Sequence, residues 1–355
     1  MVHTTPNPGN LSPAPLMQLA TGFWAFKTFA GAVELELFTR LANGRTITVP
    51  QLCAELDIEE RPADLLLAAC ASLGLLQRSG AGYRNSPIAE EFLVIGKPYY
   101  FGGFVRFCDE QEYPAWQHVV RAIRTNRPIT WDPDTQESVF TTVDPVMLGL
   151  FWDAMHSFST FTARTLCDHY DFGKQSRLLD VGGGSGAFAM ELCRRNPQLT
   201  ATVFDLPHVR QQAEAKIAAA GLADVVDVAV GDFTGTAPLP TGYDMMLLSH
   251  ILHDWDDRTG RDLLAKCHAA LEPGGILVIS ELMLNAERTG PPAAALMGMN
   301  MLVETRGGKN YSETEYQTWL AEAGFARSEL VRFEAAGANG VVVAHKATVE
   351  LGAGS

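Results

Sequence analysis

The first part of the chain has hydrophobic residues at helical spacing, separated by short polar breaks. Between residues 31 and 41 every fourth position is apolar, which indicates one face of a helix (Val33, Leu37 and Leu41). Thr48 followed by Pro50 predicts another helix start, because threonine caps helices and proline fits the first turn. A further helix is expected over 63–73, and 74–85 is typical of two short strands around a glycine-rich turn. Together these elements predict a winged-helix arrangement.

The pattern changes from Arg177 onward. Short apolar or β-branched runs alternate there with helical stretches, which indicates βαβ units around a parallel sheet. The expected strands are 177–181, 201–205, 225–230, 244–249, 276–280, 328–333 and 341–345. The loop between the last two suits a β-hairpin, so the final pair should be antiparallel. We predict an α/β fold with a Rossmann-like seven-stranded sheet.

These two patterns define the domain organisation that we expect. Residues 96–170 have a helical pattern that is rich in aromatic residues and methionine. The predicted segments are a disordered lead-in (1–15), a winged-helix domain (16–95), a helical linker and substrate-pocket region (96–170) and the α/β domain (171–348).

The charge of the chain argues against nucleic acid and membrane surfaces as partners. There are 27 basic and 41 acidic side chains, a formal charge of −14, which repels phosphates and anionic lipid. Residues 1–95 hold six Lys or Arg and nine Asp or Glu, a net charge of −3. Helix 61–70 is nearly all apolar, whereas a helix that reads a DNA groove needs polar side chains. Burial against a second subunit suits these helices better.

The cysteines and the chain start bear on location. The six cysteines are scattered and no two form a C-x-x-C pair, so we expect reduced thiols and no zinc site. The first 15 residues lack the basic and apolar regions of a signal peptide. No apolar run reaches the roughly 18 residues of a membrane span. We expect a cytoplasmic protein.

A glycine-rich segment follows the first expected strand of the α/β domain. Gly182 and Gly184 allow a tight turn and close approach of a ligand, and Asp180 ends the strand, where such sheets bind ligands. Asp205 ends the second strand, placed to receive ribose hydroxyls. The spacing also fits a dinucleotide fingerprint, so NAD stays open at this point. After the third strand, Asp232 suits an adenine amino group or a helix cap.

Six short motifs together resemble one enzyme family. They are Leu179-Asp-Val-Gly-Gly-Gly-Ser-Gly, Phe204-Asp-Leu-Pro, Gly231-Asp-Phe, Ile251-Leu-His-Asp-Trp, Leu271-Glu-Pro-Gly-Gly and Ala323-Gly-Phe. Their order and spacing are similar to those of small-molecule O-methyltransferases, which include plant caffeate and flavonoid enzymes, acetylserotonin methyltransferase and bacterial antibiotic-tailoring enzymes. The resemblance covers most of the chain. It implies S-adenosylmethionine as cofactor, which becomes S-adenosylhomocysteine, and a homodimer formed through the N-terminal domain.

The resemblance also implies which residues form the cofactor site. Gly182 and Asp205 should contact the cofactor, Asp232 and Phe233 its adenine, and Ser249 its methionine portion. The complete set of expected cofactor residues is Asp180, Gly182, Gly184, Asp205, Leu206, Asp232, Phe233 and Ser249.

A general base is expected for methylation of a phenol, whose pKa is near 10. Histidine fits this requirement, and His253 follows the fourth expected strand at the ligand-binding edge. Glu281, at the end of the fifth strand, should hold the other ring nitrogen. Asp254 is interpreted as structural, because neighbouring side chains at a helix start point apart. Plant members carry a second glutamate where this sequence has Asn310, and an amide can orient a group but adds no charge.

Two helical stretches should line the acceptor site. They are 148–163, with Trp152, Met155, His156 and Phe158, and the helix before Gly307, with Met297, Asn300, Met301 and Glu304. Each residue alone is as consistent with plain core, but together they suit a flat aromatic ring, with Asn300 as a polar guide. The resemblance further implies that Phe23 and Trp24 reach the partner subunit's pocket.

We therefore expect methyl transfer to a hydroxyl of a small aromatic acceptor. The alternatives are C-methylation of an activated phenol or indole ring, a relative that binds the cofactor only structurally, an NAD-dependent reductase, and a winged-helix binding protein. A reductase would need a hydride-site Tyr/Lys pair, which we do not find in the sequence.

Overall fold

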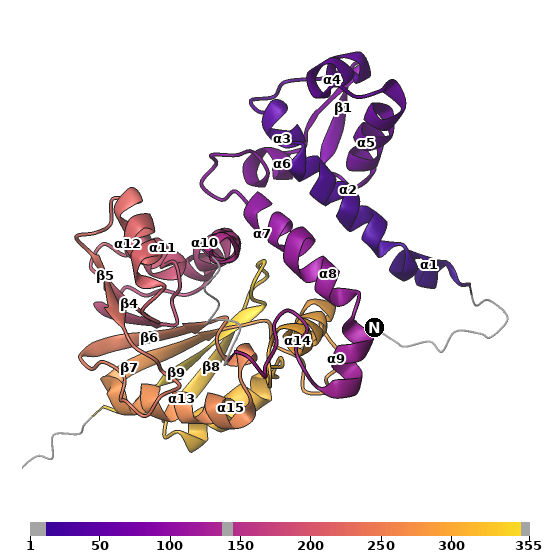
Figure 1. Cartoon of the computed structure of the whole chain (residues 1–355). Helices are drawn as coiled ribbons and strands as arrows, with labels where there is room; N and C mark the ends of the chain where they lie inside the picture. The colour runs from indigo at the N-terminus through magenta and orange to yellow at the C-terminus, as the bar shows by residue number, and fades with distance from the viewer. Residues whose placement is uncertain (1–11, 137–144, 349–355) are drawn as a thin grey trace, which may run out of the picture. The chain divides into compact units, whose positions relative to one another are not determined.

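The computed structural model describes residues 12–136 and 145–348 (Figure 1). The chain forms two compact units that meet in sequence between Asp109 and Glu110. Residues 1–11 of the expected lead-in lie outside the described residues, and helix α1 (Ala14–Ala20) begins within the remainder of it. The finer division into four segments stays a prediction.

The N-terminal unit has the predicted winged-helix arrangement. Its helices are α1, α2 (Gly22–Glu34), α3 (Leu37–Arg40), α4 (Val49–Leu56), α5 (Glu60–Ser72), α6 (Pro87–Phe92) and α7 (Gly102–Phe107). Strands β1 (Leu76–Ser79) and β2 (Gly82–Asn85) form the antiparallel hairpin, and Ile47 bridges to Tyr83 beside it. Thr48 caps α4 through a capping box with Gln51, as the sequence predicted for the helix start.

One helix prediction in this unit is wrong. The apolar spacing over residues 31–41 predicted a continuous helix, but α2 ends at Glu34 and α3 starts at Leu37. Between them Glu36 has a φ of 52°, in the left-handed region, which interrupts the helix. The three apolar residues of this pattern are nevertheless buried (Val33, Leu37 and Leu41). The spacing therefore predicted their burial correctly, although it did not predict the break in the helix.

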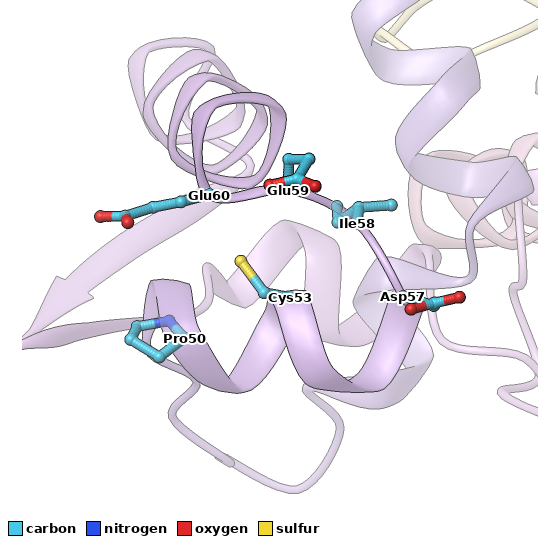
Figure 2. Close-up of a pocket in the computed structure, with 6 residues that line it drawn as sticks. All are labelled: Pro50, Cys53, Asp57, Ile58, Glu59 and Glu60. Atoms are coloured by element: carbon cyan, nitrogen blue, oxygen red, sulfur yellow. The ribbon is translucent and has the colours of Figure 1, made fainter.

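A pocket of the N-terminal unit lies between the end of α4 and the start of α5. Figure 2 shows the residues that line it, with Cys53 of α4 pointing toward the segment that leads into α5 (Pro50, Cys53, Asp57, Ile58, Glu59 and Glu60). Three of these six side chains are carboxylates, so the pocket has the wrong sign of charge for a phosphate backbone.

The second unit contains the predicted α/β domain. A π-helical turn, Cys108–Glu112, leads into it. Its helices are α8 (Tyr113–Trp116), α9 (Val119–Thr125), α10 (Pro145–His169), α11 (Ala187–Arg195), α12 (Arg210–Ala219), α13 (Asp257–Ala270), α14 (Pro292–Glu304) and α15 (Glu313–Glu322). Its strands are β3 (Arg177–Val181), β4 (Thr200–Asp205), β5 (Val226–Val230), β6 (Tyr243–Ser249), β7 (Leu271–Ser280), β8 (Arg327–Arg332) and β9 (Gly340–His345).

These strands form one sheet in the order β5-β4-β3-β6-β7-β9-β8. The first five strands of this order run parallel, while β9 is antiparallel to both β7 and β8. The seven strands and the antiparallel final pair are therefore confirmed. Because β4 and β6 flank β3 on opposite sides, the chain reverses its direction of travel across the sheet at the carboxyl end of β3. Open α/β sheets bind ligands at such a point.

Both faces of the sheet are covered by helices. Helices α10, α11 and α12 lie on one face, and α13 and α15 lie on the other (Figure 1). Alternate residues of β6 enter the two cores, with Met245 and Leu247 on the first face and Met246 and Leu248 on the second. Burial on both sides explains why the parallel strands are continuous apolar runs in the sequence.

No helix within the described ranges, 12–136 and 145–348, combines the length and the apolar character needed to cross a lipid bilayer.

Candidate active site

A tight turn between β3 and α11 forms the first part of the site. Gly182 and Gly184 have positive φ values of 72° and 56°. A Cβ on Gly182 would lie 2.4 Å from Ile251 Cδ1, and one on Gly184 would lie 2.6 Å from Trp152 Cζ3. Any other residue would be strained in its backbone and would clash, so this turn requires glycine for conformation and for space.

Asp205, at the end of β4, is tied to this turn. Its Oδ2 accepts the Gly184 N–H at 2.7 Å, and its Oδ1 accepts the Leu206 N–H at 2.6 Å. Burial raises the pKa of Asp205, against the effect of these two hydrogen bonds. A carboxylate oxygen has more than one acceptor site, so both oxygens can also receive the hydroxyls of a ribose.

Two buried polar atoms lie near the carboxyl ends of adjacent strands and lack a partner within the described residues. They are Asp180 Oδ2 on β3 and Ser249 Oγ on β6. Burial raises the pKa of Asp180 to about 7, and the charge of Asp205 adds to the effect. Buried polar groups are normally hydrogen-bonded, so a polar ligand at this edge would supply what they lack. Together with the glycine turn and Asp205, these residues fit an adenosyl amino-acid cofactor.

The loop after β5 carries the expected adenine residues. Asp232 is exposed, and its Oδ1 accepts the N–H and the hydroxyl of Thr234 at 2.8 and 2.6 Å. Phe233 is half-buried and packs edge to face on Trp255 at 5.7 Å. Lys266 Nζ donates to the Phe233 carbonyl at 2.6 Å, which anchors the loop to α13.

His253 lies in a 3₁₀ turn, Leu252–Asp254, directly after β6. Its Nδ1 is 2.5 Å from Glu281 Oε2, at the end of the neighbouring strand β7. The other Glu281 oxygen accepts the N–H groups of Ile251 and Leu252 at 3.1 and 3.0 Å. Glu281 is completely buried, and it fixes both the turn and the imidazole ring.

Asp254 differs from its sequence interpretation. It was expected to point away from His253, but its Oδ1 lies 3.6 Å from His253 Nε2. Both residues belong to the same short 3₁₀ turn, and within it the Asp254 carboxyl reaches back to the imidazole. Burial lowers the pKa of His253, but the charges of Glu281 and Asp254 outweigh burial and raise it to about 9. Burial raises the pKa of Asp254 to about 6.

Asn310 lies in the segment after α14 and is buried. Its Nδ2 donates to the Leu282 carbonyl at 2.6 Å, one residue beyond Glu281, while its Oδ1 has no partner within the described residues. This amide therefore anchors the chain next to Glu281. A catalytic role for Asn310 stays a prediction.

The expected acceptor residues of α10 lie against the cofactor turn and the His253 region. Trp152 covers Gly184, and His156 Nδ1 is 2.9 Å from Ser185 Oγ in the glycine turn. Phe158 packs on the ring of His250 at 4.9 Å, and Met155 is half-buried. Burial lowers the pKa of His156 to about 4, with Lys216 adding to the effect, so the ring is neutral at pH 7. Contact of these four residues with an acceptor stays a prediction.

The expected acceptor residues of α14 form a partly polar face. Met297 packs with a small apolar cluster and Met301 is buried. Asn300, expected to be a polar guide for the acceptor, uses its amide within the protein: its Nδ2 donates to Glu112 Oε1 at 2.8 Å, and its Oδ1 accepts from Trp116 Nε1 at 2.7 Å. Glu304 at the end of the helix has one oxygen without a partner among the described residues.

Sequence reasoning missed His250 as part of this region. Its φ is 57°, and its buried ring packs near Phe158 and lies 6.2 Å from the ring of His253. Its Nε2 donates to the Gly337 carbonyl at 2.8 Å. Its position between Ser249 and the His253 turn was the only available signal.

The remaining prediction concerns the N-terminal unit. Phe23 and Trp24 are exposed there to 49% and 62% and contact each other edge to face. Their insertion into a partner subunit stays a prediction.

Within the described part of the chain, no group of three or more His, Cys, Asp or Glu side chains is arranged to hold a metal ion.

Comparison with solved structures identifies the class of protein. The chain superposes on human N-acetylserotonin methyltransferase, solved in complex with S-adenosylmethionine, with a TM-score of 0.82 and 28% identity over 98% of this chain and 100% of that one. With the sheet order, the glycine turn and Asp205, this similarity defines an S-adenosylmethionine-dependent methyltransferase.

The family follows from sequence models. The O-methyltransferase domain model matches residues 116–326, and the O-methyltransferase dimerisation domain model matches residues 17–94. The chain belongs to the O-methyltransferase family.

Two bacterial relatives extend the comparison. A 3-hydroxy-5-methyl-1-naphthoate 3-O-methyltransferase of Streptomyces sahachiroi is 45% identical, over 96% of this chain and 97% of the relative. An L-tyrosine C(3)-methyltransferase of Streptomyces lavendulae is 31% identical, over 92% and 90% of the two chains. Members similar to this chain thus include enzymes named for methyl transfer to oxygen and to carbon.

Proposed function

We propose that this chain transfers a methyl group to a hydroxyl of a small aromatic natural product, with His253 as the general base. The observation that carries the proposal is the buried imidazole, whose Nδ1 is held by Glu281 at 2.5 Å and whose Nε2 lies 3.6 Å from Asp254 Oδ1, beyond hydrogen-bond distance. The relative named for a hydroxynaphthoate supports an aromatic acceptor with a ring hydroxyl.

The cofactor would be held by the glycine turn and by acids at the strand ends. Asp205 would bind the ribose hydroxyls, and Asp232 and Phe233 would bind the adenine. Asp180 and Ser249 would form hydrogen bonds to polar groups of the cofactor through the side-chain atoms that lack a partner. Bound S-adenosylmethionine supplies an electrophilic methyl group, and the protein supplies alignment and proton removal.

His253 suits removal of a phenol proton in this environment. The two carboxylates raise its pKa to about 9, close to the value of about 10 for a phenol. Proton transfer between groups of similar pKa is nearly balanced, so the acceptor oxygen can give up its proton at little cost in free energy. Glu281 then stabilises the imidazolium, and its bonds to the backbone keep the ring in place.

Replacing the imidazole tests the proposal. His253→Ala should lower turnover about 10²- to 10⁴-fold, the usual contribution of a general base. Binding of S-adenosylhomocysteine, measured by isothermal titration calorimetry, should change little. His118→Ala, at an exposed histidine before α9, is the matched control and should retain turnover. Unchanged turnover in His253→Ala would remove this residue as the base.

C-methylation is the second candidate, and the tyrosine C-methyltransferase relative favours it. The same base would remove the phenol proton, and the ring carbon would then attack the methyl group. Carbon-13 nuclear magnetic resonance of the product separates the two functions, because O–CH₃ and C–CH₃ carbons resonate far apart. A new C–CH₃ signal would replace the first proposal with the second.

A further inference from the structure

The last residue of α14, Glu304, has a carboxyl group with an unusual set of contacts. Its Oε2 accepts from the Thr130 hydroxyl at 3.2 Å, whereas Oε1 is buried and has no partner within the described residues. The Glu304 carbonyl accepts from Trp131 Nε1 at 2.6 Å, which fixes the end of the helix against the 130–131 segment. The free oxygen is therefore held in a defined position.

Glu304 belongs to the region of the reacting groups. Helix α14 packs against the 3₁₀ turn that carries His253. Directly after the helix, the chain passes so close to this turn that a Cβ on Gly308 would lie 2.4 Å from the His253 carbonyl oxygen. The carboxyl of Glu304 also feels the charge of Asp254, the neighbour of His253.

The two charged groups that act directly on the Glu304 carboxyl are both acidic. Glu112, from the π-helical turn, and Asp254, from the 3₁₀ turn, both act on it, and its hydrogen-bond partner is the neutral Thr130. The nearest cation in sequence, Arg306, turns away: its guanidinium lies over the Trp131 ring and donates to the Pro133 and Gln136 carbonyls. A buried carboxyl among other carboxyls takes up a proton instead of a charge.

Burial, and then the charge of Glu112, raise the pKa of Glu304 to about 8. At pH 7 the group is therefore mostly a neutral carboxylic acid, which has one O–H to donate. Since Oε2 already accepts from Thr130, the proton is left to Oε1, the atom without a partner.

We propose that Glu304 selects the acceptor by donating a hydrogen bond from Oε1 to an uncharged carbonyl oxygen, so that the enzyme takes hydroxyarenes bearing a ketone, ester or amide. This inference rests on the proposed function and names its substrate class. Asn300, one turn earlier, is already held within the protein: its Nδ2 donates to Glu112 Oε1 and its Oδ1 accepts from Trp116 Nε1.

Charged substituents are expected to bind less well at this position, which would distinguish this chain from the relative named for a 1-naphthoate, a carboxylate. A carboxylate would gain a charge-assisted hydrogen bond from Glu304, but it would place a further negative charge beside Glu112 and Asp254. An ammonium group would pair only with the ionised form of Glu304, which is the minor form at pH 7. A hydrogen in place of the carbonyl would leave the buried O–H without an acceptor.

A panel of 3-hydroxynaphthalenes that differ only at carbon 1 tests the inference. The substituents are acetyl, carboxamide, carboxylate, aminomethyl and hydrogen, and binding to the full chain saturated with S-adenosylhomocysteine is measured by calorimetry at pH 7. The acetyl and carboxamide compounds should bind about tenfold or more tighter than the hydrogen compound. The inference would be overturned if the carboxylate or the aminomethyl compound bound more tightly than the acetyl and carboxamide compounds. Equal binding of all five compounds would overturn it too.

Two variants identify Glu304 as the source of the preference. Glu304→Gln keeps an uncharged donor and should retain the preference for the carbonyl compounds. Glu304→Leu removes the donor, so the acetyl and carboxamide compounds should then bind no more tightly than the hydrogen compound. S-adenosylhomocysteine titration of each variant shows that its cofactor site is intact. A preference that survives in Glu304→Leu would contradict the assignment.

The outcome is separable from that of the proposed function. Methylation of the panel at carbon, or turnover that is unchanged in His253→Ala, would overturn the proposed function while leaving the Glu304 binding order intact. Failure of every panel member to bind would overturn the acceptor class itself.

Discussion

At the scale of single residues, the site depends on carboxyl groups whose protonation differs with their surroundings. Glu281 accepts three hydrogen bonds and faces an imidazolium, so despite burial its pKa is lowered. Glu304 faces other carboxyls, and its pKa is raised. The same side chain thus serves as a fixed negative charge in one place and as a neutral donor in another.

The pH dependence of methyl transfer follows from the pKa of His253. A general base must be unprotonated, so kcat/KM should rise with pH through about 9, the pKa to which the carboxylates raise this histidine. Glu281→Gln removes the larger of the two charges and should move the midpoint to lower pH, while Asp254→Asn should move it in the same direction by less. Profiles of kcat/KM against pH for the three proteins measure the shifts. An identical midpoint in all three would show that these charges do not set the pKa of the base.

Some residue contacts were not accessible from the sequence. His253 and Glu281 could be paired in advance, because they follow neighbouring parallel strands. The contact of Asp254 with His253 depends on the side-chain conformations within the turn, and no residue pattern signalled it. The partners of Asn300 lie 184 and 188 positions away, on short helical segments whose placement no periodicity determines.

At the scale of elements, helix α10 supports the glycine turn. Trp152 covers Gly184, and one helical turn later His156 bonds to Ser185. These contacts come from one face of a helix that was predicted only to line an acceptor site. The positions of the strands were easier to predict than this contact. A strand that is buried on both faces needs a continuous apolar run in the sequence, whatever ligand is bound.

Cofactor affinity should depend on the bond between His156 and Ser185. His156→Phe and Ser185→Ala each remove it and should weaken S-adenosylhomocysteine binding about 3- to 10-fold, the usual effect of one hydrogen bond. His156→Asn can place a polar atom near the position of Nδ1 and should restore part of the affinity. Isothermal titration calorimetry measures these constants, with His169→Phe, at an exposed histidine of the same helix, as control.

The double variant provides a further check. If the two side chains act through one bond, His156→Phe combined with Ser185→Ala should bind no more weakly than either single variant. Full additivity of the two effects, or unchanged affinity in both single variants, would show that the turn does not rely on this contact.

At the scale of the whole molecule, the two units present different surfaces. The N-terminal unit has large apolar side chains exposed along its first two helices, including Leu16, Leu19 and Trp24 at 66%, 80% and 62%. Such a run of exposed apolar residues is typical of an association surface. Most of this run lies within residues 17–94, which match the dimerisation domain model. The winged-helix elements were predictable from local patterns, but the break at Glu36 was not, because a non-glycine residue rarely adopts a positive φ.

We propose that the chain is a homodimer formed through α1 and α2, and light scattering at micromolar concentration should give twice the mass of one chain. Leu19→Asp places a charge within the apolar run and should shift the protein toward monomer, because burying an unpaired carboxylate opposes association. Leu296→Asp, at a leucine of α14 in the second unit that is exposed to 61%, should leave the mass unchanged. A monomeric wild-type chain would exclude the homodimer. Equal dissociation by both substitutions would show that the association surface lies elsewhere.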